Sequence, residues 1–241
     1  MELDIAIPAH NEEDIILPTL LLVSETLSQI PNLTWKIIVA ENGSSDNTYD
    51  VVDKAGLPHV EIFRARQTGK GAAIKEAAEH SRAQYFGFID ADASVDPKTI
   101  STALDILDEG HAQLVIGSRF HKESAVDRSF LRHISSRIFN LLARAIVGIH
   151  VNDTQCPLKV MNADAKVLLL HSKENEWLLD LEHIARAEQG GLTISSIPIL
   201  WEEFRYPLRK SKLHLTTDGR RAIVQMFQLR KRLAEEARYG A

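Results

Sequence analysis

Two carboxylates at the end of an apolar segment are the residues best suited to chemistry. Asp90 and Asp92 are separated by one alanine and come directly after the apolar run Tyr85–Ile89. A buried strand gains nothing from this pair, whereas a hard divalent cation prefers carboxylate oxygens and can also hold the phosphates of a substrate. Asp-x-Asp pairs are common in loops, so it is the position after a strand that indicates a metal site.

Two glycine-containing segments could bind an anion in the same region. Glu41–Thr48 follows the apolar run Lys36–Ala40, and its Gly43 suits a sharp turn before a helix whose early amides could face a ligand. Gly69-Lys70-Gly71 places a cation between two permissive residues near another helix start. The spacing is not that of a phosphate-binding P-loop, so an ATPase is not indicated.

The elements that must position these residues alternate between strand and helix. Five short runs rich in Ile, Val and Phe predict strands at Leu3–Ile7, Lys36–Ala40, Val60–Arg64, Tyr85–Ile89 and Gln113–Ile116. A longer segment with helical spacing follows each run, which predicts an α/β fold with a Rossmann-like, mostly parallel sheet flanked by helices. Ligands of such sheets bind at the carboxyl ends of the strands, where the unusual residues fall.

Further elements are expected along the rest of the chain. The first helix is predicted to begin at Asn11, with Glu12, Glu13 and Asp14 in its first turn, and another to follow Gly71 with alanines on a close-packed face. Later segments predict helices over 129–147 and 179–189, strands at Leu158–Met161 and Thr193–Ile197, and a basic helix from Thr217. Residues 1–241 are expected to form one domain, divided into a nucleotide half (1–118) and an acceptor half (119–241).

Composition sets the class of protein. With 241 residues, 44% of them hydrophobic, the chain can bury a substantial core. No run approaches the roughly 20 apolar residues of a membrane-spanning helix, and the N-terminus leads into a strand pattern, so a cytoplasmic protein is expected. The single cysteine, Cys156, excludes internal disulfides and is expected to be a plain buried residue.

Charge is unevenly distributed along the chain. The net charge is -5, yet residues 119–144 hold six Lys or Arg against two Asp or Glu, and residues 205–232 hold nine against one. Basic segments in an acidic protein favour a local anionic ligand, such as a phosphate or a lipid headgroup, over nucleic acid. Two solvated helix faces would explain the same counts.

Six motifs occur in an order typical of one enzyme family. They are Ile7-Pro-Ala-His-Asn-Glu-Glu13, Glu41-Asn-Gly-Ser-Ser-Asp46, Gly69-Lys-Gly-Ala-Ala73, Asp90-Ala-Asp92, Ile116-Gly-Ser-Arg119 and Asp153-Thr-Gln-Cys156. Together they resemble glycosyltransferase family 2, and within it the dolichyl-phosphate mannose synthases and dolichyl-phosphate glucosyltransferases. The resemblance spans roughly residues 3–225.

The resemblance implies a GT-A fold that binds a nucleotide diphosphate sugar through Mg²⁺ or Mn²⁺. It makes Asp92 the direct metal ligand and lets Asp90 contact ribose, phosphate or metal. The residues it assigns to the nucleotide are Pro8, Ala9, Asn11, Glu13, Glu41 and Lys70, while Lys212 would reach the diphosphate. Glu41 stands where the family usually has Asp, so the base stays open, and UDP-glucose and GDP-mannose are both expected donors.

The second half would hold the acceptor. The resemblance assigns the acceptor phosphate to Arg119 and Arg132, and less firmly to Arg137; Arg128 is also near. Six apolar residues between them, Phe130, Leu131, Ile134, Ile138, Phe139 and Leu142, could contact a lipid chain or belong to the core. Asp180 in Trp177–Glu182 would shape the acceptor or sugar site, and would act as a base only for an alcohol acceptor. Trp201 and Ser211-Lys212 match late family elements, while Pro157 replaces a usual glycine.

The implied reaction is a single displacement that inverts the anomeric carbon, with a polyprenyl phosphate as acceptor. Because no spanning segment is predicted, peripheral, salt-sensitive attachment of the basic segments to an anionic membrane surface is expected. Two alternatives remain: a family 2 enzyme acting on a soluble hydroxyl acceptor, and a noncatalytic nucleotide-sugar-binding protein. The oligomeric state is left open.

Overall fold

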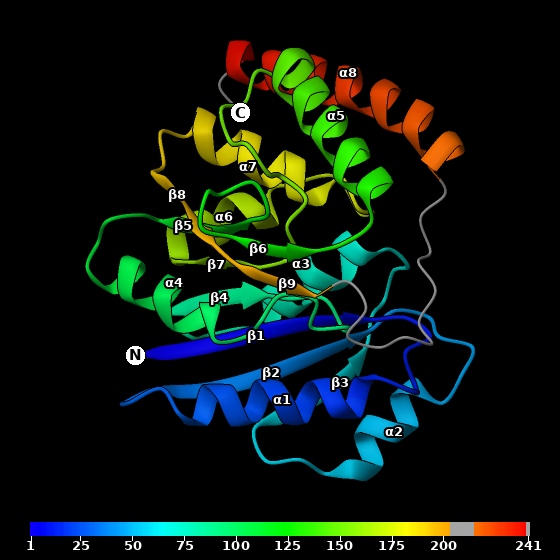
Figure 1. Cartoon of the computed structure of the whole chain (residues 1–241), viewed down its shortest axis with the longest axis vertical. Coiled ribbons are helices and arrows are strands. Elements are labelled where there is room, and N and C mark those ends of the chain that lie inside the picture. Colours follow the sequence, from blue (N-terminus) through cyan, green and yellow to red (C-terminus); the bar gives the residue numbers. More distant parts are fainter. Residues whose placement is uncertain (203–214, 240–241) are drawn as a thin grey trace.

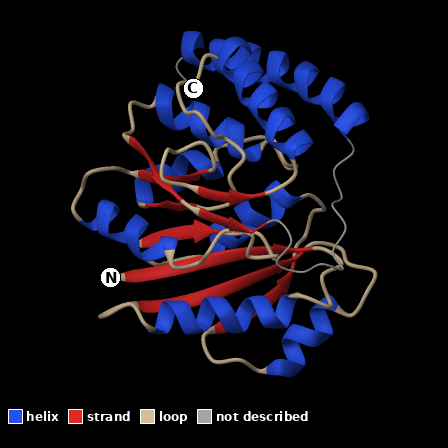
Figure 2. Ribbon diagram, viewed as in Figure 1, coloured by secondary structure: helices blue, strands red, loops and turns tan. Residues whose placement is uncertain are grey.

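A seven-stranded sheet forms the centre of the computed structural model, which describes residues 1–202 and 215–239 (Figures 1 and 2). The strand order is β3-β2-β1-β4-β7-β5-β8. The strands are β1 (Glu2–Ala9), β2 (Thr34–Glu41), β3 (Val60–Arg64), β4 (Tyr85–Phe88), β5 (Leu114–Ser118), β7 (Lys159–Met161) and β8 (Ile194–Pro198). Among these strands β7 alone runs antiparallel to its neighbours, so the prediction of a mostly parallel sheet is confirmed.

Helices cover both faces of the sheet. One face carries α1 (Ile16–Ser28), α2 (Thr48–Ala55) and α4 (Thr99–Asp108). The other carries α3 (Lys70–His80), α6 (Ala163–Leu170) and α7 (Leu179–Gln189), with α5 (Phe130–Val147) and α8 (Leu215–Tyr239) packed as an outer pair (Figure 1). A small two-stranded sheet pairs β6 (Ala125–Asp127) with β9 (Leu200–Glu202). The basic C-terminal helix expected from the sequence is therefore present.

The two cores follow from the alternation of side chains along the strands. In β1, Leu3, Ile5 and Ile7 pack beneath α1 and α4, while Ala6 faces α3 on the other side. This is the period of two expected of a strand that is covered on both faces. The alanines predicted to form a close-packed face of α3 are buried, including Ala73 and Ala77, so this prediction is confirmed.

The predicted start of the first helix is wrong. Helix α1 begins at Ile16, five residues after Asn11, and its first turn contains no acidic residue. Asn11 has a positive φ of 53°, and its side-chain oxygen accepts a hydrogen bond from the backbone N–H of Ser45 at 2.7 Å. Its own N–H donates to Ser44 Oγ at 3.0 Å. Asn11 therefore joins two loops instead of capping a helix, although its residue type suits both tasks.

The two halves of the chain share one sheet. Strand β5, at the end of the first half, pairs with β7 and β8 from the second half. Strand β7 also pairs with β4, so that Val160 lies between Gly87 and Val115. The boundary at residue 118 therefore runs through a continuous hydrogen-bonded layer.

No helix within residues 1–202 and 215–239 combines the length and the apolar composition needed to cross a membrane.

Candidate functional site

The carboxyl ends of β1, β2 and β4 bring the first group of predicted residues together. In the parallel register, Pro8 pairs with Ala40 and Ala9 with Glu41. Strand β4 lies on the other side of β1, and the chain continues from it into Asp90 and Asp92. The loops that carry the predicted nucleotide and metal residues therefore leave the same edge of the sheet, as the open-sheet rule requires.

The loops after β1 and β2 are joined by reciprocal hydrogen bonds. Glu13 Oε2 accepts from the backbone N–H and the side-chain amide of Asn47 at 3.0 and 2.8 Å. In return, the N–H of Glu13 donates to Asp46 Oδ2 at 3.1 Å. Burial would raise the pKa of Asp46, but its hydrogen bonds to Thr48 and Glu13 lower it below its ordinary value. Asn11 and Glu13 thus build the shape of this end of the site.

Glu41 lies at the centre of the second loop. Its carboxylate is buried and accepts a hydrogen bond from the backbone N–H of Ser44. The intervening Gly43 has a φ of 69°, a backbone conformation that glycine adopts at low cost. The next side chain, Asn42, accepts from the N–H of Gly69 at 2.9 Å and so ties this loop to the start of α3.

Lys70 and the Asp-x-Asp pair form the charged centre of the site. Lys70 Nζ lies 2.5 Å from Asp90 Oδ1. Burial alone would lower the pKa of Lys70, but the carboxylates of Asp90, Asp180 and Asp92 together raise it above its ordinary value. Asp92 Oδ1 accepts from the N–H and the hydroxyl of Ser94 at 3.0 and 2.5 Å, which fixes the carboxylate at the turn.

The donor set suits a divalent cation that shares its coordination with a ligand. Asp90 and Asp92 are only partly buried and supply hard carboxylate oxygens at a strand end. Within residues 1–202 and 215–239, no group of three or more His, Cys, Asp or Glu is arranged to hold a metal by itself. Two carboxylates with the phosphates of a nucleotide would match a metal such as Mg²⁺, which keeps few protein ligands.

The glycines around Lys70 serve a close approach of two backbones. A Cβ on Gly69 would lie 2.2 Å from the carbonyl oxygen of Asn175, and one on Gly71 would lie 2.7 Å from that of Glu176. The Asn175 carbonyl also accepts from the N–H of Ala72 at 2.9 Å. The amide of Ala72 in the first turn of α3 is thus engaged by the protein and is not available to an anion.

The loop that presses on these glycines is held by Glu182, the last residue of the Trp177–Glu182 segment, for which no individual role was predicted. Glu182 is completely buried, and its Oε2 accepts from the N–H groups of Lys173 and Glu174 at 3.0 and 2.8 Å. The same carboxylate pairs with Arg186 at 2.7 Å and with Arg232 of α8 at 2.9 Å. Four partners satisfy a buried charge that would otherwise be costly.

Asp180, two residues earlier, points to a different partner. Its Oδ1 lies 2.6 Å from Nζ of Lys159, and both side chains are buried. Lys159 also donates to the carbonyls of Thr154 and Cys156 at 3.1 and 2.8 Å, so it anchors the loop before β7. Lys159 was not among the predicted site residues. Its position inside the apolar run Leu158–Met161 nevertheless indicates a buried ion pair, because lysine is rarely buried without a partner.

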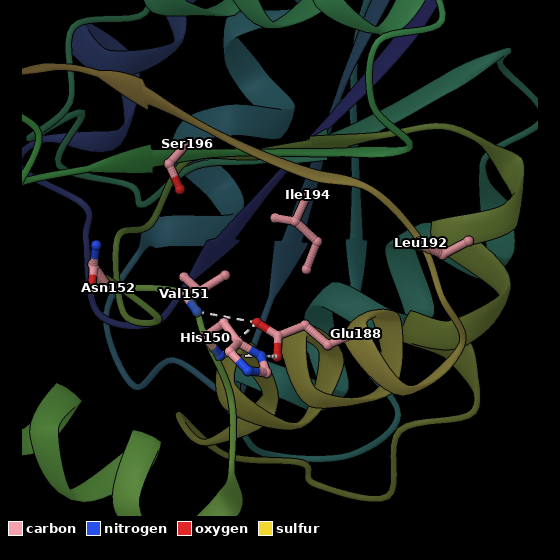
Figure 3. Close-up of a pocket in the computed structure, with 7 residues that line it drawn as sticks. All are labelled: His150, Val151, Asn152, Glu188, Leu192, Ile194 and Ser196. Carbon is pink, nitrogen blue, oxygen red and sulfur yellow. Dashed lines mark hydrogen bonds and ion pairs between the residues drawn. The ribbon is translucent and has the colours of Figure 1, made fainter.

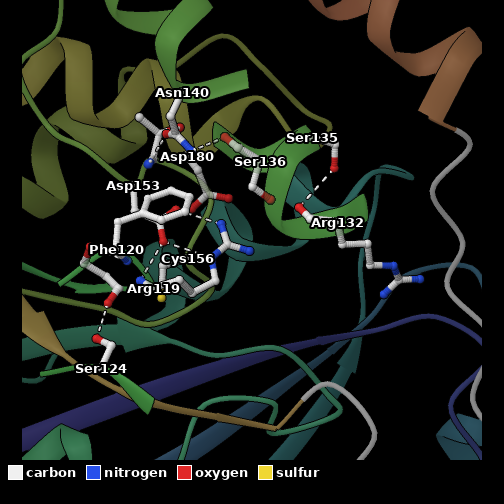
Figure 4. A network of polar contacts seen from close by, with 12 residues as sticks. Arg119, Phe120, Ser124, Arg132, Ser135, Ser136, Asn140, Asp153, Cys156 and Asp180 are labelled. Carbon is white, nitrogen blue, oxygen red and sulfur yellow. Dashed lines mark hydrogen bonds and ion pairs between the residues drawn. The ribbon is translucent and has the colours of Figure 1, made fainter. Parts of the chain in front are cut away.

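Arg119 forms a bidentate pair with Asp153. Its Nε and a terminal nitrogen donate to the two carboxylate oxygens at 2.9 and 2.7 Å, and both residues are buried (Figure 4). Burial opposes the charge of each, but the pair raises the pKa of Arg119 and lowers that of Asp153. The guanidinium also lies over the ring of Trp201, 5.1 Å from its centroid. Two nitrogens of the Arg119 guanidinium are therefore engaged by Asp153.

A group of cations continues from Arg119 into α5. Arg128 is half-buried, and burial together with the charges of Arg119 and Arg132 lowers its pKa to about 10. Burial and the neighbouring arginines Arg128, Arg137 and Arg119 also lower the pKa of His133. Figure 4 shows the side chain of Arg132 extending away from the Arg119–Asp153 pair. The structure thus places Arg119 and Arg128 together, while Arg132 extends away from the Arg119–Asp153 pair but remains close enough for its charge to act on Arg128.

Cys156 is a buried residue, as predicted. It forms no disulfide, and burial raises the pKa of its thiol to about 12, so it is not a reactive thiolate. Ser211 and Lys212 lie outside the described residues.

A pocket of about 410 Å³ lies elsewhere on the protein (Figure 3). Glu188 occupies one wall, where its carboxylate accepts from the N–H groups of His150 and Val151. Ile194, at the amino end of β8, forms another part of the wall. None of the predicted site residues within the described part of the chain lines this pocket.

The chain is similar in sequence to known glycosyltransferases. The sequence model described as "Glycosyl transferase family 2" matches residues 4–167. A dolichyl-phosphate beta-glucosyltransferase of Trichomonas vaginalis, ALG5C, is 31% identical over 215 residues, which cover 82% of this chain and 63% of the relative. Glycosyltransferase AglD of Haloferax volcanii is 28% identical, over 90% of this chain and 35% of its own length. The chain therefore spans about a third to two thirds of these two relatives.

A solved structure shows the same fold. Glucosyl-3-phosphoglycerate synthase from Mycobacterium tuberculosis, in complex with Mn²⁺, uridine diphosphate and glucosyl-3-phosphoglycerate, superposes with a TM-score of 0.68 at 18% identity. The superposition covers 95% of this chain and 79% of that one. With this architecture and the family match over residues 4–167, the chain belongs to glycosyltransferase family 2 and has the GT-A fold.

Proposed function

We propose that the protein transfers a hexose from a nucleotide diphosphate sugar to a polyprenyl phosphate, with inversion at the anomeric carbon. The observation that carries this proposal is the juxtaposition of two oppositely charged groups. The carboxylates Asp90 and Asp92 follow strand β4, and Asp90 is close enough to contribute to the raised pKa of Arg119. The charge of Arg119 in turn acts on Arg128, so a cationic group continues from the carboxylate pair. Dolichyl-phosphate beta-glucosyltransferases from Trichomonas and human are among the similar proteins, which supports a lipid phosphate as acceptor.

The donor would lie over the carboxyl ends of β1, β2 and β4. The joined loops that contain Asn11, Glu13 and Glu41 would hold the nucleoside, since they gather polar side chains at one edge of the sheet. Lys70 would contact the diphosphate, because its raised pKa keeps it charged at neutral pH. UDP-glucose and GDP-mannose both meet these requirements.

A divalent cation bound by Asp90 and Asp92 would neutralise charge that develops on the departing diphosphate. Lys70 would add a second positive charge at the same position, and this would favour departure without proton transfer.

The acceptor phosphate would approach from the side of Arg119 and α5. Arg128 and Arg132 are the proposed phosphate contacts, because the guanidinium of Arg119 is already bound by Asp153. Burial, and after it the charges of neighbouring arginines, lower the pKa of Arg128 and of His133, which supports a cationic environment here. Fork-shaped guanidinium groups match the oxygens of a phosphate monoester.

Asp180 would act by position and not as a base. Its carboxylate is bound by Lys159, and the phosphate oxygen that attacks is already anionic and has no proton to lose. The Lys159–Asp180 pair would instead hold the loop before β7 against the sugar site.

The test is a product assay with the purified protein, Mn²⁺ or Mg²⁺, and a panel of nucleotide sugars. Each donor is incubated with a polyprenyl phosphate, with the corresponding polyprenol, or with a water-soluble alcohol glycoside, and products are identified by mass spectrometry. Transfer to the phosphate and not to either alcohol is expected, with an inverted linkage by NMR. Transfer only to an alcohol would overturn the acceptor, and no turnover with any donor would favour a noncatalytic binding protein.

A further inference from the structure

Helix α5 presents large apolar side chains to the outside of the protein. Five of them are exposed, with relative exposures of 75% for Phe130, 72% for Leu131, 38% for Ile134, 53% for Ile138 and 58% for Leu141. We call these five residues the α5 stripe. Side chains three or four positions apart share one side of a helix, so 130, 134, 138 and 141 form a continuous row.

The α5 stripe is distinct from the face that packs on the core. Ala143 and Ile146 are buried on the opposite side of the helix, and Phe139 and Leu142 pack partly against the same core. The six apolar residues of this segment noted in the sequence therefore divide into two groups. A contiguous exposed row of this kind marks an interaction surface, because single exposed apolar residues are ordinary but clusters are not.

Cations border the α5 stripe. Arg137 and Arg144 are exposed on the same helix, about two and four turns along from the start of the row. Helix α8 packs beside α5, where Arg230 donates to the carbonyl of Ile146 at 3.1 Å. It too exposes apolar side chains, with Val224 and Phe227 each at 56%. Exposed Arg220, Arg221 and Lys231 accompany them.

The row begins at the candidate acceptor site. Phe130 follows Arg128 by two residues, and the next turn of α5 contacts the Arg119 loop through the rings of His133 and Phe120, whose centroids are 5.7 Å apart. Arg137 lies over the same Phe120 ring at 5.7 Å. A surface that binds the α5 stripe would therefore also lie next to the candidate acceptor site.

An apolar helix face bordered by arginines complements an anionic lipid surface. A helix of this type lies in the interface, with its apolar side chains at the boundary between headgroups and acyl chains and its cations among the headgroups. Attachment by charge alone, as expected from the sequence, would be screened by salt, whereas apolar burial is not.

We propose that the α5 stripe inserts into the boundary of an anionic bilayer and orients the acceptor site toward the membrane surface. Arg128 and Arg132 then lie at the depth of lipid phosphates, beside the start of the row. This inference rests on the proposed lipid-phosphate acceptor for its functional meaning, but the insertion itself is tested separately.

The first experiment measures flotation with vesicles of phosphatidylcholine and phosphatidylglycerol, in 0.1 M and 1 M NaCl. The test variant is Ile138→Asp/Leu141→Asp, which alters two members of the α5 stripe that stand away from the candidate site. The matched control is Leu21→Asp/Val167→Asp, since Leu21 on α1 and Val167 on α6 are 51% and 47% exposed. We expect at least tenfold weaker binding for the test variant, unchanged binding for the control, and residual binding of the wild type in high salt.

The second experiment measures depth. Ile138→Cys is labelled with a fluorophore, which is selective because Cys156 is buried. Brominated lipids should quench the label when vesicles are added, and should not quench the same label at Leu21→Cys.

Several outcomes would overturn the inference. The test variant could float like the wild type, or the label on α5 could escape quenching. A wild-type dimer that dissociates in the Ile138→Asp/Leu141→Asp variant, with no vesicle binding by either, would assign the row to a second copy of the chain. An assay with a short, water-soluble polyprenyl phosphate separates the two proposals. If the wild type does not transfer sugar to it, the proposed acceptor is contradicted. If the Ile138→Asp/Leu141→Asp variant no longer floats but still transfers sugar to it, both proposals are supported.

Discussion

The ammonium group of Lys70 lies 2.5 Å from a carboxylate oxygen of Asp90, so a cation of the protein already pairs with the first residue of the Asp-x-Asp motif. We predict that Lys70→Met weakens UDP or GDP binding by about tenfold or more, because it removes a charge-assisted contact to the diphosphate. In the same variant, Mn²⁺ binding without nucleotide should become stronger, since a competing positive charge is gone.

Calorimetry with nucleotide and paramagnetic resonance with Mn²⁺ measure the two effects. Lys54→Met on α2 is the control, because Lys54 is exposed and pairs only with Asp50 among the described contacts. If Lys70→Met weakens the binding of both nucleotide and Mn²⁺, Lys70 does not compete with the metal for Asp90.

Asp92→Asn should reduce turnover by roughly 100-fold or more, the order seen when an electrostatic group at a reaction centre is removed. The fold should survive, because the amide oxygen of asparagine can still accept the hydrogen bonds from Ser94. Turnover at saturating Mn²⁺ and thermal unfolding are measured together. Asp96→Asn, four residues on, is the control, and near-normal activity of Asp92→Asn would refute the metal assignment.

Arg132→Ala should raise the KM for polyprenyl phosphate by about tenfold, the cost of one hydrogen bond to a charged group, with little change in UDP or GDP affinity. The backbone carbonyl of Arg132 accepts from Arg128 and from Ser135 Oγ, and both contacts survive the substitution. Steady-state kinetics and nucleotide titration separate the effects. A loss of nucleotide affinity at constant acceptor KM would show that the division of labour is wrong.

Arg119→Ala provides an instructive contrast. It would leave the buried carboxylate of Asp153 without its bidentate partner, which typically destabilises a protein by about 3–5 kcal/mol. Its effect on activity would therefore accompany unfolding, whereas that of Arg132→Ala would not, and denaturant titration distinguishes the two variants.

Stability should fall in mild acid because of His183. Burial lowers the pKa of this histidine to about 4, from 6.5 when exposed, and its Nε2 donates to the carbonyl of Ala165 at 2.9 Å. The folded protein thus resists protonation while the unfolded chain accepts it, so stability is full above pH 6.5 and is lost progressively toward pH 4. The loss is at most about 3 kcal/mol.

Denaturant unfolding between pH 7 and pH 4.5 measures this dependence. His183→Gln retains a donor near the Nε2 position but does not titrate, so its stability should change less over that interval. Equal slopes for both proteins would exclude His183 as the cause.

Local patterns predicted the strands well and the loop contacts poorly. The apolar runs at Val60–Arg64 and Tyr85–Ile89 match β3 and β4 almost residue for residue. Strand β4 is buried throughout and is therefore apolar along its length, whereas β3 at the edge of the sheet is only partly buried and was recognised from its Val, Ile and Phe. Asn11 and Glu13 have the composition of a helix start, yet both bind the loop after β2. Residue type indicates that a side chain will bind a backbone amide, but only the fold determines which one.

The candidate site shows the same limit. Asp90 and Asp92 were predicted as site residues because a buried strand gains nothing from a carboxylate pair at its end. Arg119 was also found, but its partner Asp153 lies 34 residues away, and a pattern of neighbouring cations cannot reveal that pairing. Lys159 and Glu182 went unrecognised because each acts through contacts with distant segments.

The antiparallel strand β7 has a consequence for how the chain must fold during synthesis. When a ribosome has made residue 118, β5 exists, but neither of its partner strands has been translated. Strand β4 at that moment has β1 on one side and an unpaired edge on the other. Only after residue 161 emerges can a three-residue strand close the gap, and β8 comes later still. We therefore expect residues 1–118, expressed alone, to be unstable or to aggregate, since the cut exposes one edge of β4 and both edges of β5.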